Sequence, residues 1–280
     1  MSRQTITSPR VPGSYNTGMN KKQTVPKRHT NQCKQCGRSF KTNHPESATC
    51  SRGCRTLYFK RFVEDDDIFT SLGASARSYI LGLIAADGCV YLDKASGRRR
   101  VNLTSKDEEL IRTIHGLLHT ANSRAIYHGG GAYSFNYIND SAISRLISYG
   151  ISERKSLSLR LSASLMDDVV VSDFIRGVFD GDGSVYVSRR YRDRVYLGVS
   201  ITSGSREFLE ELSLLLEWNL GISARIHKDS RRDHSAYYLR IGKSRDIAQF
   251  RDFIYSGQSV QLGLFLDRKR AVFKIADDVL

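Results

Sequence analysis

Two stretches of ten residues decide the fold: Tyr79-Ile-Leu-Gly-Leu-Ile-Ala-Ala-Asp-Gly88 and Phe174-Ile-Arg-Gly-Val-Phe-Asp-Gly-Asp-Gly183. Each is a mainly apolar run that ends in Asp-Gly, and each has a glycine at its fourth position. The match continues downstream, where residues 101–105 align with 199–203 and residues 132–136 align with 236–240. The two copies are offset by 95 residues, the distance from Asp87 to Asp182. A repeat of about 95 residues is longer than a solenoid unit, so the sequence indicates a duplicated half-domain with pseudo-two-fold symmetry.

The hydrophobic periodicity of the second copy predicts the element order αββαββα, which is an α+β fold. Its segments are expected as follows: a helix over 172–182 that opens near Ser172 or Asp173 and is stopped by Gly183, strands near 184–188 and 194–201, a helix from Ser205 through Trp218, strands near 222–228 and 236–242, and a helix near 245–255. The first copy predicts the same order, with Ser105-Lys-Asp-Glu108 as a capping box before its middle helix. The two repeats are expected to occupy residues 63–170 and 171–280.

The repeated glycines and acids predict a metal site. Gly82 and Gly177 fall in the middle of their helices, where a glycine costs about 1 kcal/mol relative to alanine, so we expect two backbones to meet there. Asp87 and Asp182 would then emerge together at one end of the helix pair. The helix dipole and mutual repulsion disfavour two carboxylates at that place, and a divalent cation between them removes the conflict. Hard oxygen ligands favour Mg²⁺, which can activate water and neutralise the leaving oxygen of a phosphodiester.

The charge of the chain points to a polyanionic partner. The net charge is +14 and the pI is near 9.7, which favour nucleic acid first and an anionic membrane second. Residues 1–62 hold 13 lysines and arginines and one acid, so +12 of the net charge lies there. Residues 1–31 are rich in proline and polar residues and predict a disordered basic arm. No apolar run approaches the roughly 20 residues of a spanning helix or follows the arm as a secretory signal, so we expect an intracellular protein without a membrane partner.

Four cysteines within residues 32–62 predict a Zn²⁺ finger. Cys33 and Cys36 precede Gly37, and Cys50 and Cys54 follow with a spacing that would place both on one helix face. Four thiolates suit tetrahedral zinc, and a segment this short has too little core to fold without metal. His44 stays open as an alternative ligand. The fifth cysteine, Cys89, is expected to be a small buried residue.

Polar residues alternate with apolar ones along the expected strands, which predicts a nucleic-acid surface. If the valines and leucines pack on the helices, the alternating side chains face outward, where arginine can pair with guanine and asparagine with adenine. The candidates are Arg98, Arg100, Asn102, Tyr186, Arg190, Arg194, Tyr196, Arg225, His227, Tyr238 and Arg240. Base contact, phosphate contact and plain solvation are all open for each of them.

Over roughly residues 75–275 the pattern resembles the LAGLIDADG homing endonucleases in their single-chain, two-motif form. The resemblance implies a monomer in which two antiparallel sheets form a saddle on double-stranded DNA. It also implies Mg²⁺-dependent cleavage of both strands across the minor groove, leaving short 3′ overhangs, with metal-binding acids at Asp87 and Asp182. The family often has a basic residue near the active site, for which Lys269 is the best candidate and Lys155 a weaker counterpart. One departure is Ala85, which stands where the second copy has Asp180, a position that does not bind metal in the family.

Three functions therefore stay open after the sequence is read. The retained acids favour a site-specific DNA endonuclease over a non-catalytic DNA-binding regulator. An RNA-binding intron maturase on the same scaffold is the third, because basic strands serve RNA and DNA alike. The cysteine segment resembles treble-clef-like fingers attached to other nucleases. The terminal residues lack a splicing His-Asn, so we expect an intron-encoded or free-standing enzyme rather than an intein.

Overall fold

The computed structural model describes residues 29–65, 68–93, 97–118, 126–189, 195–230 and 236–277. The chain divides into two compact units, Met1–Arg55 and Thr56–Leu280. In the first unit, β1 (His29–Gln32) and β2 (Ser39–Thr42) form an antiparallel hairpin in which His29 lies opposite Thr42. The predicted arm lies outside the described residues up to position 28, and its last three residues belong to β1. The helix α1 (Arg52–Asp65) begins near the end of this unit.

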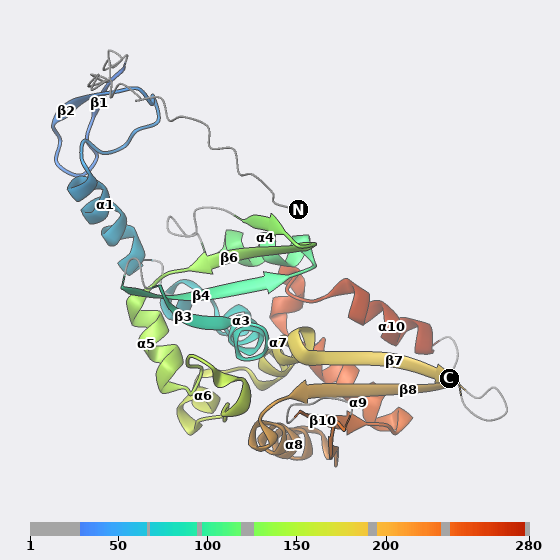
Figure 1. Ribbon diagram of the computed structural model, residues 1–280. Coiled ribbons are helices and arrows are strands. Elements are labelled where there is room, and N and C mark those ends of the chain that lie inside the picture. Colours follow the sequence, from blue (N-terminus) through green and yellow to red (C-terminus); the bar gives the residue numbers. More distant parts are fainter. Residues whose placement is uncertain are drawn as a thin grey trace, which may run out of the picture. The chain divides into compact units, whose positions relative to one another are not determined.

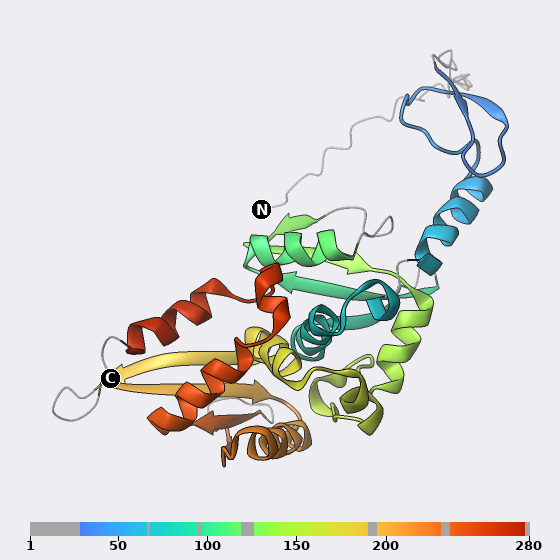
Figure 2. The same cartoon turned by 180° about the vertical axis from the view of Figure 1, so that it is seen from behind.

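The second unit contains the two repeats, shown in Figures 1 and 2. After the short helix α2 (Ile68–Ser71), the first repeat runs through α3 (Ala74–Ala86), β3 (Cys89–Asp93), β4 (Arg98–Ser105), α4 (Glu108–Leu117), β5 (Tyr127–Gly129), β6 (Ala132–Tyr137) and α5 (Asp140–Ser148). The second runs through α7 (Val171–Asp182), β7 (Gly183–Arg189), β8 (Val195–Ser203), α8 (Arg206–Leu220), β9 (Arg225–Lys228), β10 (Tyr237–Ile241) and α9 (Ser244–Ile254). The predicted order αββαββα is confirmed in both.

The two sheets have the same topology. Their strand orders are β3-β4-β6-β5 and β7-β8-β10-β9, and all pairs are antiparallel. Helices α4 and α5 pack on the first sheet, and α8 and α9 pack on the second. The apolar strand positions face these helices, so Val101, Phe135, Val199 and Leu239 are fully buried. One face of each sheet is therefore left for polar side chains.

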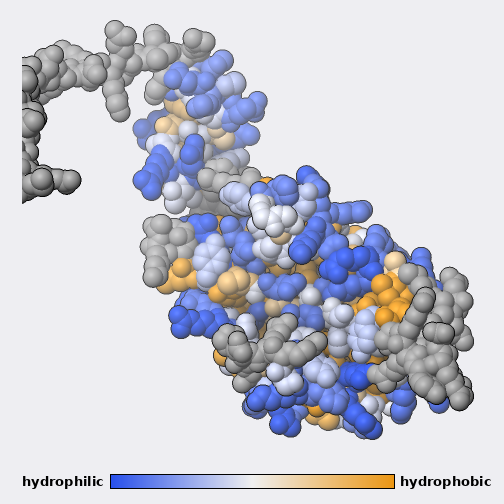
Figure 3. Space-filling view, turned by 45° about the vertical axis from the view of Figure 1, so that its right-hand side comes forward, coloured by the Kyte–Doolittle hydropathy of each residue, from blue (hydrophilic) through white to orange (hydrophobic). Residues whose placement is uncertain are grey.

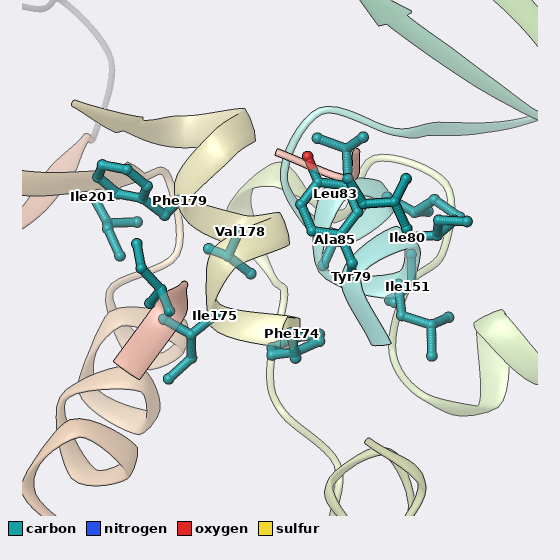
Figure 4. Packing of buried hydrophobic residues seen from close by; sticks show 14 of the residues in the cluster. Tyr79, Ile80, Leu83, Ala85, Ile151, Phe174, Ile175, Val178, Phe179 and Ile201 are labelled. Carbon is teal, nitrogen blue, oxygen red and sulfur yellow. The ribbon is translucent and has the colours of Figure 1, made fainter. Parts of the chain in front are cut away.

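Helices α3 and α7 form the contact between the repeats, and glycine makes it possible. A methyl group on Gly82 would collide with the carbonyl oxygen of Phe174 and lie 3.0 Å from the nitrogen of Val178. A methyl group on Gly177 would collide with the carbonyl oxygen of Tyr79 and lie 2.7 Å from the nitrogen of Leu83. Figure 4 shows the two helices side by side, with Ile175 and Phe179 of α7 directed away from α3 and the ring of Tyr79 lying between the helices. The predicted backbone approach is thus present.

Each repeat ends in further elements that the sequence did not predict. Helices η1 (Lys155–Leu157) and α6 (Ala163–Asp168) follow α5, and η3 (Gln258–Leu262) and α10 (Asp267–Asp277) follow α9. The first three are too short to show a hydrophobic period, and α10 opens with four charged residues. No helix in the described part of the chain is long and apolar enough to span a bilayer.

The predicted capping box before α4 is wrong. Strand β4 extends to Ser105, which pairs with Tyr133 of β6. The helix instead begins after Asp107, whose backbone N–H donates to the Ser105 hydroxyl at 3.1 Å. Sheet pairing holds Ser105 in the strand, so Asp107 takes the N-cap position.

Candidate active site and nucleic-acid interface

The two acids of the repeated motif lie together at one end of the α3–α7 pair. Asp87 follows α3 directly, and its backbone N–H donates to the carbonyl of Leu83 at 2.9 Å. Asp182 is the last residue of α7. Gly181 provides the close approach, because a Cβ at this position would lie 3.3 Å from the carboxyl carbon of Asp87. The structure therefore brings together the two acids that the sequence singled out.

Two buried lysines flank these acids. Lys155 in η1 donates to the carbonyl of Ala86 at 3.0 Å, and Lys269 in α10 donates to the carbonyls of Phe179 and Asp180 at 2.6 and 2.7 Å. Each ammonium thus lies at the C-terminal end of a motif helix, where positive charge is favoured. The sequence predicts Lys155 as the weaker counterpart, yet both side chains reach carbonyls in the last turn of a motif helix and are 6% and 5% exposed.

The two acids shift the pKa values of the two lysines, and the lysines shift that of Asp87. Desolvation raises the pKa of Asp87, while Lys269 and Lys155 oppose that rise. Desolvation lowers the pKa of Lys155, and it lowers that of Lys269 to about 8, while Asp87 and Asp182 raise both. Asp87 is solvent-exposed and Asp182 is half-buried, so an ion from solvent can reach them. Two oxygen-donor acids at an accessible edge fit a hard divalent cation. Its positive charge would favour the ionised form of Asp87 and so oppose the desolvation that raises the pKa of this carboxyl.

The polar face of the first sheet extends away from Asp87. The register places Cys89, Asn102 and Asn136 side by side across three strands, and the next row pairs Tyr91 with Arg100. The Asn136 side-chain oxygen accepts hydrogen bonds from Tyr91 and Asn102, both at 3.1 Å. Arg98 lies farther along β4, opposite Asp93. The three candidates of this repeat thus share one face.

The second sheet presents a matching face. The register aligns Ser184, Ser200, Arg240 and Arg225 across its four strands. A parallel row contains Tyr238 and His227, whose rings stack with centroids 5.2 Å apart. Tyr186 lies opposite Gly198 and Tyr196 lies one row beyond, opposite Ser188. Arg190 and Arg194 lie outside the described residues.

Cys89 contradicts its predicted burial. It is exposed and is the first residue of β3, immediately after Asp87-Gly88. Strand alternation places it on the same face as Tyr91, next to the acids.

Figure 3 shows that hydrophilic side chains dominate the viewed surface of the second unit, with smaller apolar patches between them.

The four clustered cysteines form a second candidate site in the first unit. Their sulfur atoms all lie within 4.8 Å of one another, with Cys50 at 3.6 Å from Cys36 and at 3.5 Å from Cys54. A tetrahedron with zinc–sulfur bonds of about 2.3 Å has edges of about 3.8 Å, so the cluster fits zinc. Among the described residues His44 is not part of this group.

Backbone geometry prepares the cluster for a cation. Desolvation raises the pKa of the Cys33 thiol, but N–H groups of Cys50, Cys36 and Gln35 outweigh it and bring that pKa to about 6. Hydrogen bonds with the side chains of Cys54 and Cys36 raise the pKa of Cys50 to about 12. A bound cation would let all four thiols ionise together. The prediction that Cys50 and Cys54 share a helix face is wrong, because α1 starts at Arg52 and Cys50 precedes it.

Comparisons with known proteins identify a matching family and similar folds. Residues 74–150 and 170–255 match the model of the LAGLIDADG-like domain. The homing endonuclease I-WcaI bound to its DNA recognition sequence superposes with a TM-score of 0.54 at 14% identity, over 81% of this chain and 93% of that one. I-DmoI in complex with DNA and calcium gives 0.47 at 24% identity, over 72% and 98%.

A curated relative matches over a shorter stretch. Elongation factor 2 of Methanopyrus kandleri is 37% identical over 83 residues, which are 30% of this chain and only 6% of that protein. The family model, by contrast, matches both repeats and more than half of the chain, including both Asp-Gly motifs. The protein therefore belongs to the LAGLIDADG family.

Proposed function

We propose that the protein is a site-specific endonuclease that cuts double-stranded DNA by metal-dependent hydrolysis of phosphodiester bonds. The observation that carries this proposal is the meeting of Asp87 and Asp182 at the ends of two packed helices, between two polar sheet faces. Family membership and the DNA-bound relatives support it.

The chain's own residues divide the work in the following way. Asp87 and Asp182 would hold magnesium through their carboxylate oxygens, one carboxylate from each repeat. When bound there, magnesium would supply Lewis-acid chemistry, lowering the pKa of a bound water and offsetting negative charge on the leaving oxygen. Lys155 and Lys269 keep positive charge beside the acids, where negative charge develops on the phosphate. Gly82, Gly177 and Gly181 set the spacing of the two acids because they remove side chains from the helix crossing.

The duplicated fold matches the symmetry of a duplex. The two repeats are related by a pseudo-two-fold axis, and the two strands of DNA are related in the same way. Each sheet then lies along one half of the target, and one chain suffices to address both strands as a monomer. The polar faces of the two sheets supply the base-reading and phosphate-binding side chains.

The direct test is a cleavage assay on a randomised or native-locus DNA library with and without magnesium. We expect double-strand breaks at one sequence family, and only with the metal present. Sequencing of the cut ends would give the target. Tight binding to one sequence without any cut would make the protein a DNA-binding regulator, and preference for folded intron RNA would make it a maturase.

Arg240 provides a test of base reading. It lies in the centre of the second sheet's polar face, between Ser200 and Arg225. If it reads guanine, Arg240→Ala should cost about 1–3 kcal/mol of binding and relax preference at one base pair. Binding to a panel of single-base target variants measures this. Arg245→Ala, an exposed change on α9, is the control and should leave the preference intact, whereas a uniform loss for Arg240→Ala would assign it to a phosphate.

We also propose that residues 32–62 form a zinc finger which, with the basic arm of residues 1–31, clamps DNA beside the target. The charge of +12 in residues 1–62 and the four clustered thiols support this assignment. Cys33→Ser or chelation should release one zinc ion per chain and unfold the finger. The salt dependence of DNA binding should flatten, because each lost phosphate contact removes about 0.9 from the slope. Metal content by mass spectrometry and binding at several salt concentrations check both expectations, with Cys89→Ser as the control for metal content because Cys89 lies outside the cluster.

A further inference from the structure

The two motif helices differ in what they bury. On α7, Asp173, Arg176 and Asp180 are each at most 1% exposed. The aligned positions on α3 hold Ser78, Leu81 and Ala85. Only the second repeat therefore places three ionisable groups inside the helix pair, although a buried charge costs free energy unless it is well paired.

Arg176 connects α7 to the segment that leads to Lys269. Its Nε donates to the carbonyl of Leu264 at 3.0 Å, and another of its nitrogens donates to the carbonyl of Ile254. It also pairs with Asp173 at 2.7 Å and donates to the hydroxyl of Ser259. These contacts fix both ends of residues 254–264 against the motif helix.

Asp180 completes the connection through a short cycle of hydrogen bonds. Its Oδ2 accepts from the backbone N–H of Leu266 at 3.1 Å, and the carbonyl of Leu266 accepts from the N–H of Lys269 at 3.0 Å. The Lys269 ammonium then returns to the carbonyl of Asp180 at 2.7 Å. The start of α10 is thus held to α7 by the Asp180 carboxylate, which binds Leu266, and by the carbonyls of α7 that bind Lys269. Tyr79 of the other repeat steadies the same carboxylate with a hydrogen bond of 2.9 Å.

This arrangement is poorly explained by stability alone. The Oδ1 atom of Asp180 is buried without a hydrogen-bond partner among the described residues, which is costly. Desolvation raises the pKa of this carboxyl to about 6. In the first repeat Ala85 has no side chain that could hold the segment of Lys155, whose ammonium donates to Ala86. The second repeat therefore has a buried carboxylate, absent from the first repeat, that helps to hold its lysine in place.

We propose that Asp180 is a positioning residue for Lys269, and that it makes the two strand-cutting centres unequal. The inference rests on the proposed endonuclease function. Because the pseudo-two-fold axis relates Lys155 to Lys269, each lysine faces one strand of the duplex. Loss of Asp180 should then slow the cutting of one strand and spare the other.

A strand-resolved assay tests this inference. A duplex target with a different dye on each strand reports the two cuts separately. Asp180→Ala should slow one strand by about 10- to 100-fold, the range expected when a reacting group is misplaced by about 1 Å. Lys269→Met should slow the same strand and Lys155→Met the other. Asp180→Asn keeps an acceptor for the Leu266 N–H and should recover most of the rate.

Val178→Ala is the matched control, because Val178 is fully buried on the same helix but its apolar side chain cannot hydrogen-bond the Lys269 segment. It should affect both strands alike. Equal slowing of both strands by Asp180→Ala, or no slowing, would overturn the inference while leaving the endonuclease assignment intact.

Hydrogen exchange gives a readout that does not depend on cleavage. In Asp180→Ala, peptides from residues 258–270 should exchange faster, whereas those from residues 151–158 should not change. Unchanged protection of residues 258–270 would overturn the positioning role, even for a protein that cuts no DNA. Absence of cleavage by the wild-type protein would contradict the proposed function separately.

Discussion

Double-strand cleavage is expected to disappear when Asp87 and Asp182 are both replaced by asparagine, while binding to the target persists. The amides keep the shape of the side chains but remove the charge that holds the metal. Metal ions contribute several kcal/mol to such reactions, and each 1.4 kcal/mol changes a rate about tenfold, so the rate should fall by about a thousandfold or more. Cleavage of a labelled target and a parallel gel-shift assay measure the two properties.

Single variants and a control sharpen the result. Each single Asp→Asn change should abolish double-strand cutting, with slow nicking as the residual activity. Asp167→Asn alters an exposed acid on α6 and should cut like the wild type. Full activity of the double variant would show that other groups hold the metal.

A single methyl group at the helix crossing is expected to have the second largest effect. In Gly177→Ala the new Cβ would strike the carbonyl oxygen of Tyr79, which belongs to rigid helical backbone. Overpacking of this kind costs about 1–3 kcal/mol, and the forced separation should also move the two acids apart. Thermal unfolding and cleavage rate should therefore both fall.

Gly116→Ala makes the same chemical change in a place without neighbours. Gly116 lies in α4, and an added Cβ would meet no atom within 4 Å. Helix propensity alone then applies, so this variant should gain about 0.5–1 kcal/mol of stability. Opposite signs for the two glycines would locate the effect at the crossing, and equal melting of Gly177→Ala and wild type would contradict the close packing of α3 and α7.

The repeat made much of this molecule predictable. Two aligned Asp-Gly motifs with a mid-helix glycine were enough to expect the crossing of α3 and α7, the meeting of Asp87 and Asp182, and two equivalent sheets. Strand alternation then placed Arg100, Asn102, Arg225 and Arg240 on polar faces, where the register finds them. Such patterns are visible because they follow from periods of the backbone itself.

The remaining features depend on contacts between distant segments. The similar placement of Lys155 and Lys269 is not visible in the sequence, because η1 spans only three residues and has no hydrophobic period that would mark it as the counterpart of α10. The i, i+4 spacing of Cys50 and Cys54 suited a helix, but the backbone N–H of Cys50 donates to the sulfur of Cys33, which holds Cys50 in the loop before α1. The sequence places no matched histidine near Cys89 and so predicts a buried residue rather than a nucleophile, yet Cys89 starts β3 on the exposed face, directly after Asp87-Gly88.

The contact between α3 and α7 at the two glycines is symmetric, and this symmetry bears on how a two-repeat chain can arise. Gly82 and Gly177 meet the equivalent backbone of the opposite helix, so the contact is self-complementary and would serve two identical copies as well as two fused ones. In an ancestral homodimer one glycine codon would have built both sides, and no position could change on one side alone. Gene fusion lifts that restriction, since each half then mutates independently. Ala85 and Asp180 occupy the same position of the two repeats yet differ in chemistry, whereas Gly82 and Gly177 are still the same residue in both.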